Sequence, residues 1–489
     1  MTNNRSLIFL VLGITLMGCL CLVGLGVAGV AFYRLNSSAT TPLTGPYPPA
    51  TPFLSGPYPP VTTLVATELA AAPPTSFATT PPEPDTTPVA PPSGQEIAPD
   101  VLAQMMEIEQ QVIALRGLDP NGEFDRALFS PDQLRERVIN DFVQDYTPED
   151  AQQDTLVLAA FGLIEADFDF YTFYIDLLSE QVAGFYDNET KEMVVVQGEA
   201  FAGPERLTYA HEYTHALQDQ TYDIKNGLGY DDEPCEADSE RCAAIQALLE
   251  GDATLSELQW FTTHSTSQDQ QDLFEFYETY ESPIYDSAPA FMQEDFLFPY
   301  NQGYEFVNFL FTEGGFPAVD AAYLDPPVST EQILHPNTYP NELPVTVTLP
   351  DLLPTLGDGW TLLDNSVMGE WYTYLILARG HDENTRLGDV EAERAATGWG
   401  GDAYAVYLSP AGDATALVLS TIWDTLTEAS EFAEAFQEYA TARFGPPTGD
   451  LTWESDGVVT LFVRDGDRTL WVAAPDLATA QAILAAVQP

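Results

Sequence analysis

Basic residues are scarce in this chain of 489 residues, which has 16 Lys and Arg against 75 Asp and Glu. Lys191 and Lys225 are its only lysines, and the formal net charge is −59. A surface that binds phosphate groups needs clustered Lys or Arg side chains. We therefore expect no nucleic-acid partner, and no binding of the main body to anionic membranes.

Cysteine is also rare, with four copies. Two of them, Cys19 and Cys21, lie in an apolar stretch, whereas Cys235 and Cys242 stand close together in a polar segment. The second pair predicts a local disulfide formed in an oxidising compartment. A second zinc site is the alternative, but no histidine neighbours these two residues.

Charged residues are absent from a long run near the start of the chain. Residues 7–32 are almost wholly apolar and about long enough to cross a hydrocarbon core of roughly 30 Å. A cleaved signal peptide has a shorter apolar region, of about 7–15 residues. Leu16-Met17-Gly18-Cys19 resembles a lipoprotein signal, but the apolar run continues past Cys19. The run predicts a transmembrane anchor at residues 1–35, and a single-pass cell-membrane protein that contacts the membrane through this helix only.

Proline and threonine dominate the segment that follows, residues 36–97. It contains the near repeat G-P-Y-P-P at 45–49 and 56–60, which is typical of an extended, disordered stalk. Such stalks are common outside the cell. We therefore expect the main body of the protein to be extracytoplasmic.

The run His211-Glu212-Tyr213-Thr214-His215 matches the pattern H-E-x-x-H. Pro204 and Glu205 suit a first helical turn, and no Gly or Pro follows until Gly227, so the motif is predicted to be helical. Residues i and i+4 share one helix face, so both imidazoles can bind one Zn²⁺ beside Glu212, a candidate general base. The alternative is a helix that carries two ordinary histidines.

A catalytic zinc site takes three protein ligands and keeps one open position. Residues 242–254 predict a second, mostly apolar helix that contains Glu250. Burying a glutamate costs free energy unless it is paired or bound to metal, and Gly251 leaves room for two helices to approach closely. Glu250 is therefore the predicted third ligand. The alternative is that it ends an exposed helix face.

With this set of residues the chain resembles the gluzincin metallopeptidases, in which a glutamate on a following helix completes H-E-x-x-H. The sequence E-G-D-A at 250–253 is similar to that of a membrane-anchored bacterial subset. The wider resemblance covers 181–339, including V-A-G-F-Y-D at 182–187 and P-V-S-T-E-Q-I-L-H-P at 327–336. It implies a mostly helical, zincin-like core at 98–349, in which one Zn²⁺ is bound by His211, His215 and Glu250, with Glu212 as base.

The resemblance leaves the residues around the ligands open, because Thr254 stands where thermolysin-type members have an aspartate. Zinc-bound histidines usually donate their other N–H to a carboxylate or carbonyl, for which Asp252 and Asp219 are candidates. Asp219 could equally be a solvated helix-face residue. His335 and Tyr339 are candidate donors to the oxyanion of an acyl-transfer reaction. The alternative for His335 is a helix-terminal histidine bonded to backbone.

Strand-like runs occur on both sides of the zinc motif. Residues 181–186 and 193–196 predict a hairpin, one strand of which is a candidate ledge for an extended substrate; the alternative is a purely structural hairpin. Beyond residue 349, four more such runs and two helices predict a ββαββα-like module at 350–489. The runs are 403–409, 416–422, 458–464 and 469–474, and the helices are 428–443 and 477–487. The expected fold class is thus α+β, with a transmembrane helix, a zincin-like core and this module.

These observations predict a membrane-anchored, extracytoplasmic zinc peptidase that cleaves a peptide or protein substrate with a zinc-activated water. One alternative is an inactive zincin scaffold that serves as an envelope binding protein, against which Glu212 argues, since a decayed site does not need the base. Another alternative makes the C-terminal module the functional part, with a structural zinc. That zinc would need a fourth protein ligand, which the neighbouring sequence does not offer.

Overall fold

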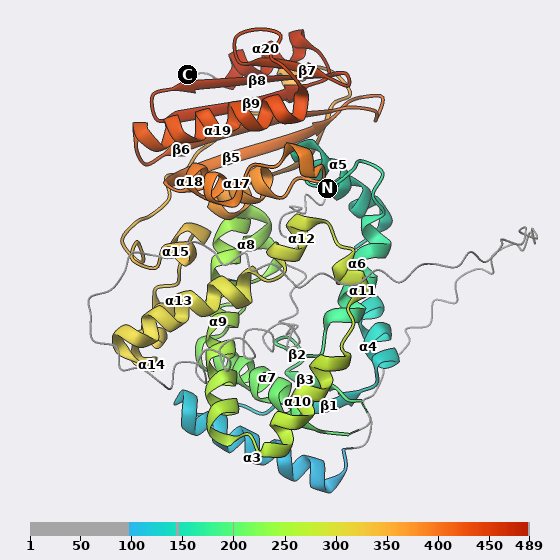
Figure 1. Cartoon of the computed structure of the whole chain (residues 1–489), viewed down its shortest axis with the longest axis vertical. Helices are drawn as coiled ribbons and strands as arrows, with labels where there is room; N and C mark the ends of the chain where they lie inside the picture. The colour runs from blue at the N-terminus through green and yellow to red at the C-terminus, as the bar shows by residue number, and fades with distance from the viewer. Residues whose placement is uncertain (1–96, 143–145, 199, 488–489) are drawn as a thin grey trace, which may run out of the picture.

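The computed structural model describes residues 97–142, 146–198 and 200–487 (Figure 1). The described chain is a mixed α+β structure, as predicted, with a six-stranded sheet in its C-terminal part. The predicted anchor and all of the predicted stalk except Ile97 lie outside the described residues.

The predicted single-pass membrane location is contradicted. Within the described ranges, every helix is too short or too polar to cross a membrane. The longest of them, α9 (Ser239–His264), has 26 residues but carries Glu250, Asp252 and Glu257, and carboxylates of this kind are costly inside a bilayer.

The N-terminal region is mostly helical, and the two segments predicted as helices, which carry H-E-x-x-H and Glu250, are both helical. The helices of this region are α3 (Pro99–Arg116), α4 (Pro131–Arg137), the π-helical η1 (Val138–Phe142), α5 (Pro148–Phe161), α6 (Phe170–Gln181), α7 (Gly203–Tyr222), α8 (Asp232–Ala237), α9, α10 (Ser267–Thr279), α11 (Pro283–Asp286), α12 (Ala290–Asp295), α13 (Phe298–Gly314), α14 (Phe316–Leu324) and α15 (Thr330–Leu334).

A small sheet lies within this helical region. The predicted hairpin is formed by β2 (Gly184–Asp187) and β3 (Glu192–Val196), which pair antiparallel with Phe185 opposite Val194. Sequence analysis missed β1 (Asp125–Phe129), which pairs parallel with β3 and gives the order β1-β3-β2. The central strand β3 is thus paired on both edges, whereas β2 is an edge strand.

The helices α7, α9 and α13 form the centre of this region, and α9 runs along it from the junction with the C-terminal module toward α3 (Figure 1). Gly251 of α9 faces Gly303 of α13, where a Cβ on Gly251 would lie 2.1 Å from the Gly303 carbonyl oxygen. Gly251 was expected to allow a close approach to the motif helix, but the close contact at this glycine is with α13 instead. Cys235 of α8 and Cys242 of α9 form the predicted disulfide.

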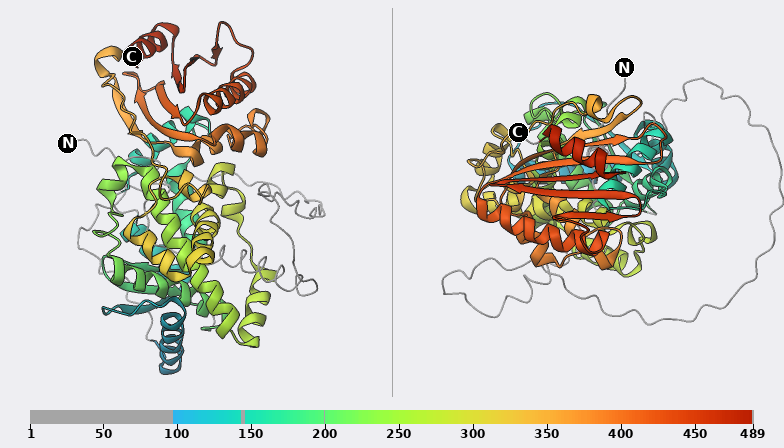
Figure 2. Two further views of the ribbon diagram at one scale, coloured as in Figure 1. Left: turned by 90° about the vertical axis from the view of Figure 1, so that its left-hand side faces the viewer. Right: turned by 90° about the horizontal axis from the view of Figure 1, so that it is seen from above.

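The C-terminal module is an antiparallel sheet with helices on both faces, as Figure 2 shows from above. The order is β4-β5-β6-β9-β8-β7. The strands are β4 (Thr361–Ser366), β5 (Trp399–Leu408), β6 (Thr415–Trp423), β7 (Thr452–Ser455), β8 (Val458–Asp465) and β9 (Arg468–Ala474). The helices are α16 (Leu353–Leu356), α17 (Gly369–Ala378), the 3-10 helix η2 (Glu383–Thr385), α18 (Asp389–Ala396), α19 (Leu426–Phe444) and α20 (Leu477–Val487).

Alternating side chains separate the two faces of this sheet. Val418 and Val472 point to the side of α16 and α20, whereas Tyr404 and Trp471 point to the side of α19 and α5. Phe161 of α5 packs edge-on against both aromatic rings. One apolar core therefore continues from the helical region into the C-terminal module.

Candidate metal centre

The H-E-x-x-H motif lies in the middle of α7, where residues on every face are buried. Pro204 occupies the first turn, and the Glu205 carboxylate accepts a hydrogen bond from the backbone N–H of Ala202. This cap satisfies a backbone donor at the start of the helix. Four-residue spacing then brings the Nε2 atoms of His211 and His215 to 3.0 Å from each other.

Glu250 of α9 completes a triangle with the two histidines. Its Oε2 lies 3.1 Å from Nε2 of His211 and 3.3 Å from Nε2 of His215. Ligand atoms around a tetrahedral zinc, at about 2.0–2.1 Å from the ion, are separated by about 3.3 Å. The three side chains therefore have the spacing of a three-ligand zinc site, and all three are buried.

The hydrogen bonds of His215 identify which ring nitrogen has a free lone pair. The Gln218 amide nitrogen donates to the Leu249 carbonyl and to Asp252, so its oxygen must face Nδ1 of His215, at 2.8 Å. Because that oxygen only accepts, Nδ1 carries the proton. Nε2 of His215 is therefore free to bind a metal.

His211 is oriented in the same way by a carboxylate. Its Nδ1 lies 2.8 Å from Oε2 of Glu257, which stands two helical turns after Glu250 on α9. A carboxylate accepts this proton and leaves Nε2 as the lone-pair atom. Three acceptor atoms thus face one another at the centre of the cluster, an arrangement that needs a positive charge between them.

Without a metal ion, a proton supplies that positive charge. Burial lowers the pKa of His211, but hydrogen bonds to Glu250 and Glu257 raise it overall to about 10. Burial raises the pKa of Glu250, but the two histidines bring it down to about 2. Metal ligands must be deprotonated, so a metal ion would displace this proton.

Glu212 belongs to the same buried cluster. Burial raises its pKa well above the usual range; the charge of His211 and a backbone hydrogen bond from Tyr186 lower it, while Glu250 and Glu257 raise it further. Strand β2 reaches this carboxylate at Gly184, where a Cβ would lie 3.3 Å from Cγ of Glu212 and 2.7 Å from Cγ2 of Thr208. Glycine at this position therefore lets β2 pack against the motif.

The structure separates the other candidate residues from this group. Asp252 contacts His215 only through Gln218, from which it accepts a hydrogen bond. It also accepts from Arg116 Nε at 2.7 Å and from the Tyr323 hydroxyl at 2.8 Å. Asp219 instead pairs with Lys191 at 2.6 Å and accepts from the Tyr186 hydroxyl. It is buried, so it is not a solvated helix-face residue.

His335 and Tyr339 also have their partners elsewhere. Nε2 of His335 lies 2.8 Å from Oε1 of Glu370 in the C-terminal module. The Tyr339 hydroxyl donates to the backbone carbonyl of Asp325 at 2.6 Å. The structure therefore does not bring these two residues into contact with the three predicted ligands.

Sequence reasoning missed Gln218, Glu257 and Tyr300. Gln218 is three residues after His215, and Glu257 is seven after Glu250, so helical spacing could have placed each near a ligand. Tyr300 of α13 lies against His211, with ring centroids 6.5 Å apart. The sequence could not show this contact, because Tyr300 and His211 are far apart in the chain and meet only where α13 packs on α9.

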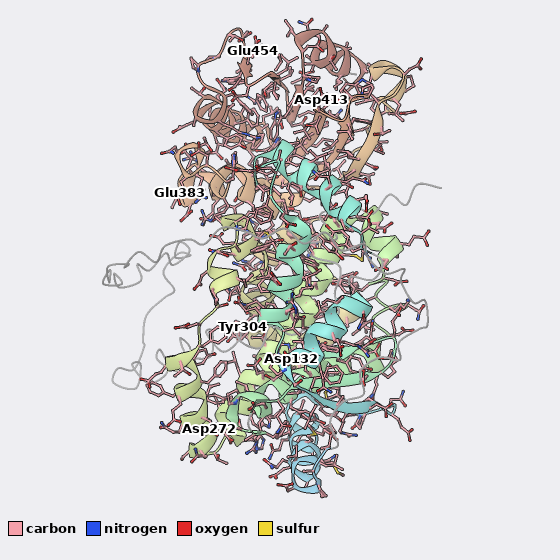
Figure 3. All side chains as sticks on the ribbon, turned by 90° about the vertical axis from the view of Figure 1, so that its right-hand side faces the viewer. Asp132, Asp272, Tyr304, Glu383, Asp413 and Glu454 are labelled. Carbon is pink, nitrogen blue, oxygen red and sulfur yellow. A yellow bond between two sulfur atoms is a disulfide. The ribbon has the colours of Figure 1, made fainter. Side chains whose placement is uncertain are left out.

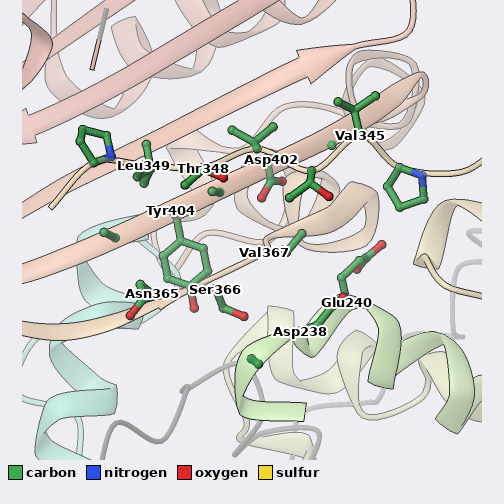
Figure 4. Close-up of a pocket in the computed structure, with 18 of the residues that line it drawn as sticks. Asp238, Glu240, Val345, Thr348, Leu349, Asn365, Ser366, Val367, Asp402 and Tyr404 are labelled. Atoms are coloured by element: carbon green, nitrogen blue, oxygen red, sulfur yellow. The ribbon is translucent and has the colours of Figure 1, made fainter. Parts of the chain in front are cut away.

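A separate pocket of about 600 Å³ lies at the junction of the two regions (Figure 4). Its acidic lining comes from Asp238 and Glu240, at the start of α9, from Asp351, and from Asp402 of β5. Glu240 accepts from the backbone and hydroxyl of Thr330, and Asp402 from the backbone N–H groups of Met368 and Gly369. These carboxylates have protein partners and do not include the metal-centre residues.

Comparison with known proteins gives one match, which covers only the C-terminal module. Residues 361–484 match a family model described as a domain of unknown function (DUF8575). No curated protein and no solved structure matches the chain.

Proposed function

We propose that this protein is a zinc-dependent peptidase of the gluzincin type that hydrolyses peptide bonds in a peptide or protein substrate. The observation that carries the proposal is the meeting of three potential ligand atoms from His211, His215 and Glu250 within 3.0–3.3 Å of one another. The resemblance seen in the sequence supports the same activity.

His211, His215 and Glu250 would hold the ion, while Glu257 and Gln218 fix the two imidazole rings. When bound, zinc supplies Lewis-acid chemistry, which polarises a peptide carbonyl and makes water more nucleophilic. Burial around the ligands excludes bulk water and strengthens the electrostatic interactions among these groups.

Glu212 is the proposed general base and acid. Its carboxylate would take a proton from the attacking water and pass it to the leaving amine. Burial, the largest influence on its pKa, favours the protonated carboxyl. The carboxylate is therefore a stronger base than an exposed glutamate, which suits proton transfer near neutral pH.

The edge strand β2 is the proposed binding site for an extended substrate, which would pair with it as an added strand. Strand β3 is excluded from this role, since β1 and β2 occupy both of its edges. Because Gly184 of β2 packs against Glu212, a peptide added to the outer edge of β2 would lie near the reacting groups.

The test is cleavage of an unfolded protein mixture by the zinc-loaded full chain, with Glu212→Gln in parallel. We expect cleavage by the parent protein and a loss of at least about a hundredfold in Glu212→Gln. Glu233→Gln, an exposed position on α8, is the matched control and should cleave like the parent. Equal cleavage by Glu212→Gln would refute the role of this base. No cleavage by a folded, zinc-loaded parent would favour an inactive binding scaffold.

A further inference from the structure

A second group of potential metal ligands lies at the junction between the helical region and the C-terminal module. It consists of Glu331 in α15, Glu342 in the following loop, and Asp424 between β6 and α19. One carboxylate oxygen of each lies within 4.8 Å of the others. These three residues, called here the junction carboxylates, share no member with the zinc cluster.

Glu331 differs from the other two junction carboxylates because its side chain is buried. It is only 4% exposed, and within the described part of the chain its carboxylate has neither a hydrogen-bond donor nor an ion-pair partner. Glu240, close by, shows the contrast, because Thr330 donates to it twice. Ionising this carboxyl beside other acidic groups is costly, so a bound cation would stabilise its charged form.

The surroundings add negative charge. Burial, together with Glu370 and Asp424, raises the pKa of Glu331 to about 9, and Glu428 acts on Asp424 in the same direction. His335 is the nearby cationic group, and it is paired with Glu370 at 2.8 Å. Among the described residues, no lysine or arginine forms an ion pair with the junction carboxylates.

We propose that the junction carboxylates bind a hard divalent cation, calcium above all. Carboxylate oxygens select Ca²⁺ or Mg²⁺ over zinc. Calcium takes six to eight oxygens at about 2.3–2.6 Å, so opposed oxygens in its shell are separated by about 4.8 Å. The spacing of the junction carboxylates falls within that limit. Because Glu342 and Asp424 are exposed, water can complete the shell.

The cation would join two parts of the molecule. Glu331 and Glu342 belong to the end of the helical region, and Asp424 lies two residues before α19 of the C-terminal module. A shared ion would therefore fix the module against α15 and stabilise the junction in which His335 and Glu370 also meet. This site does not depend on the proposed peptidase activity.

The test is calorimetric titration of the calcium-depleted full chain with CaCl₂, with thermal unfolding measured in the same buffers. We expect saturable binding of one Ca²⁺ and a higher Tm with calcium. The double substitution Glu331→Gln, Asp424→Asn should weaken this binding at least about tenfold. Glu454→Gln, an exposed carboxylate of the same module (Figure 3), should leave binding unchanged.

A second readout separates the ion site from a purely structural role. Without calcium, Glu331→Gln should raise the Tm, because the raised pKa of Glu331 lowers stability at neutral pH and an amide does not titrate, and it should reduce the Tm increase that calcium gives. Absence of saturable Ca²⁺ binding would overturn the proposal. Binding that persists in the double variant, or an equal Tm increase with NaCl at the same ionic strength, would attribute the effect to general screening of an acidic surface.

Discussion

At the scale of single residues, the proposed metal centre depends on which nitrogen of each histidine carries a proton. Gln218 and Glu257 accept from the Nδ1 atoms and leave both Nε2 atoms facing Glu250. The meeting of His211, His215 and Glu250 was predicted from the sequence, since the two histidines are one helical turn apart and Glu250 stands in an apolar segment; their roles as ligands stay a prediction. It did not predict the two orienting residues, because the sequence does not show which polar residue meets which ring.

We expect Glu257→Gln to lower zinc affinity by about 10–100-fold, since an amide is a weaker acceptor for the Nδ1–H of His211. Competition with a chromophoric zinc chelator measures this change. The Glu233→Gln control should retain the parent affinity. Unchanged affinity in Glu257→Gln would show that this carboxylate does not support the site.

At the scale of elements, two glycines allow the glutamate helix to pack closely on its neighbour. Gly251 of α9 and Gly303 of α13 face each other, and a Cβ on Gly303 would lie 2.2 Å from the carbonyl oxygen of Ala247. Backbone atoms line both contacts, so no side-chain rotation can relieve a clash.

Gly251→Ala should therefore destabilise the protein by about 3 kcal/mol, despite the helix propensity of alanine, which favours it by about 1 kcal/mol. Guanidinium denaturation measures the free energy of unfolding. Gly388→Ala is the control, because a Cβ there meets no atom within 4 Å, and its effect should stay within about 0.5 kcal/mol. Similar effects of the two substitutions would contradict the close helix contact.

Sequence patterns predicted the elements that carry strong local signals. The hairpin β2–β3 and the strands β5, β6, β8 and β9 have clear apolar runs, and the structure contains all of them. Strand β1 was missed because its partner β3 lies about 65 residues away in a parallel pairing. Strands β4 and β7 are edge strands, and only pairing with a neighbour defines them.

At the scale of the whole molecule, acidic side chains are spread over both regions. Asp132 and Asp272 lie in the helical region, and Glu383, Asp413 and Glu454 in the C-terminal module (Figure 3). Other carboxylates are buried in the core. Burial raises the pKa of Asp295 to about 6, although hydrogen bonds from Tyr372 and Trp371 lower it.

A raised carboxyl pKa in the folded state makes stability fall as pH rises, because the folded protein binds more protons than the unfolded chain. For Asp295 the stabilisation is complete below about pH 4 and is lost as pH rises through about 6. The free energy of unfolding should therefore fall by up to about 3 kcal/mol over this window for this group.

Urea denaturation at several pH values tests this expectation. Asp295→Asn should flatten the fall in the free energy of unfolding, since an amide does not ionise. Asp358→Asn, an exposed aspartate, should reproduce the parent curve. If Asp295→Asn kept the full pH dependence, the buried carboxyl would not be its source.

The core shared by the two regions favours cooperative unfolding. Arg443 of α19 donates to the backbone carbonyl of Phe161 at 2.8 Å, and the Phe161 ring packs on Tyr404 and Trp471. The predicted division at residue 350 therefore crosses a continuous apolar core.

The most direct test of the account is the zinc content of the parent, Glu250→Gln and Glu212→Gln proteins after equilibration with a zinc buffer. We predict a single tightly bound zinc ion in the parent and in Glu212→Gln, and a large loss in Glu250→Gln. That pattern would show that Glu250 is a metal ligand and that Glu212, in the same cluster, is not. Equal zinc content in Glu250→Gln and the parent, or no bound zinc in the folded parent, would contradict the proposed metal centre.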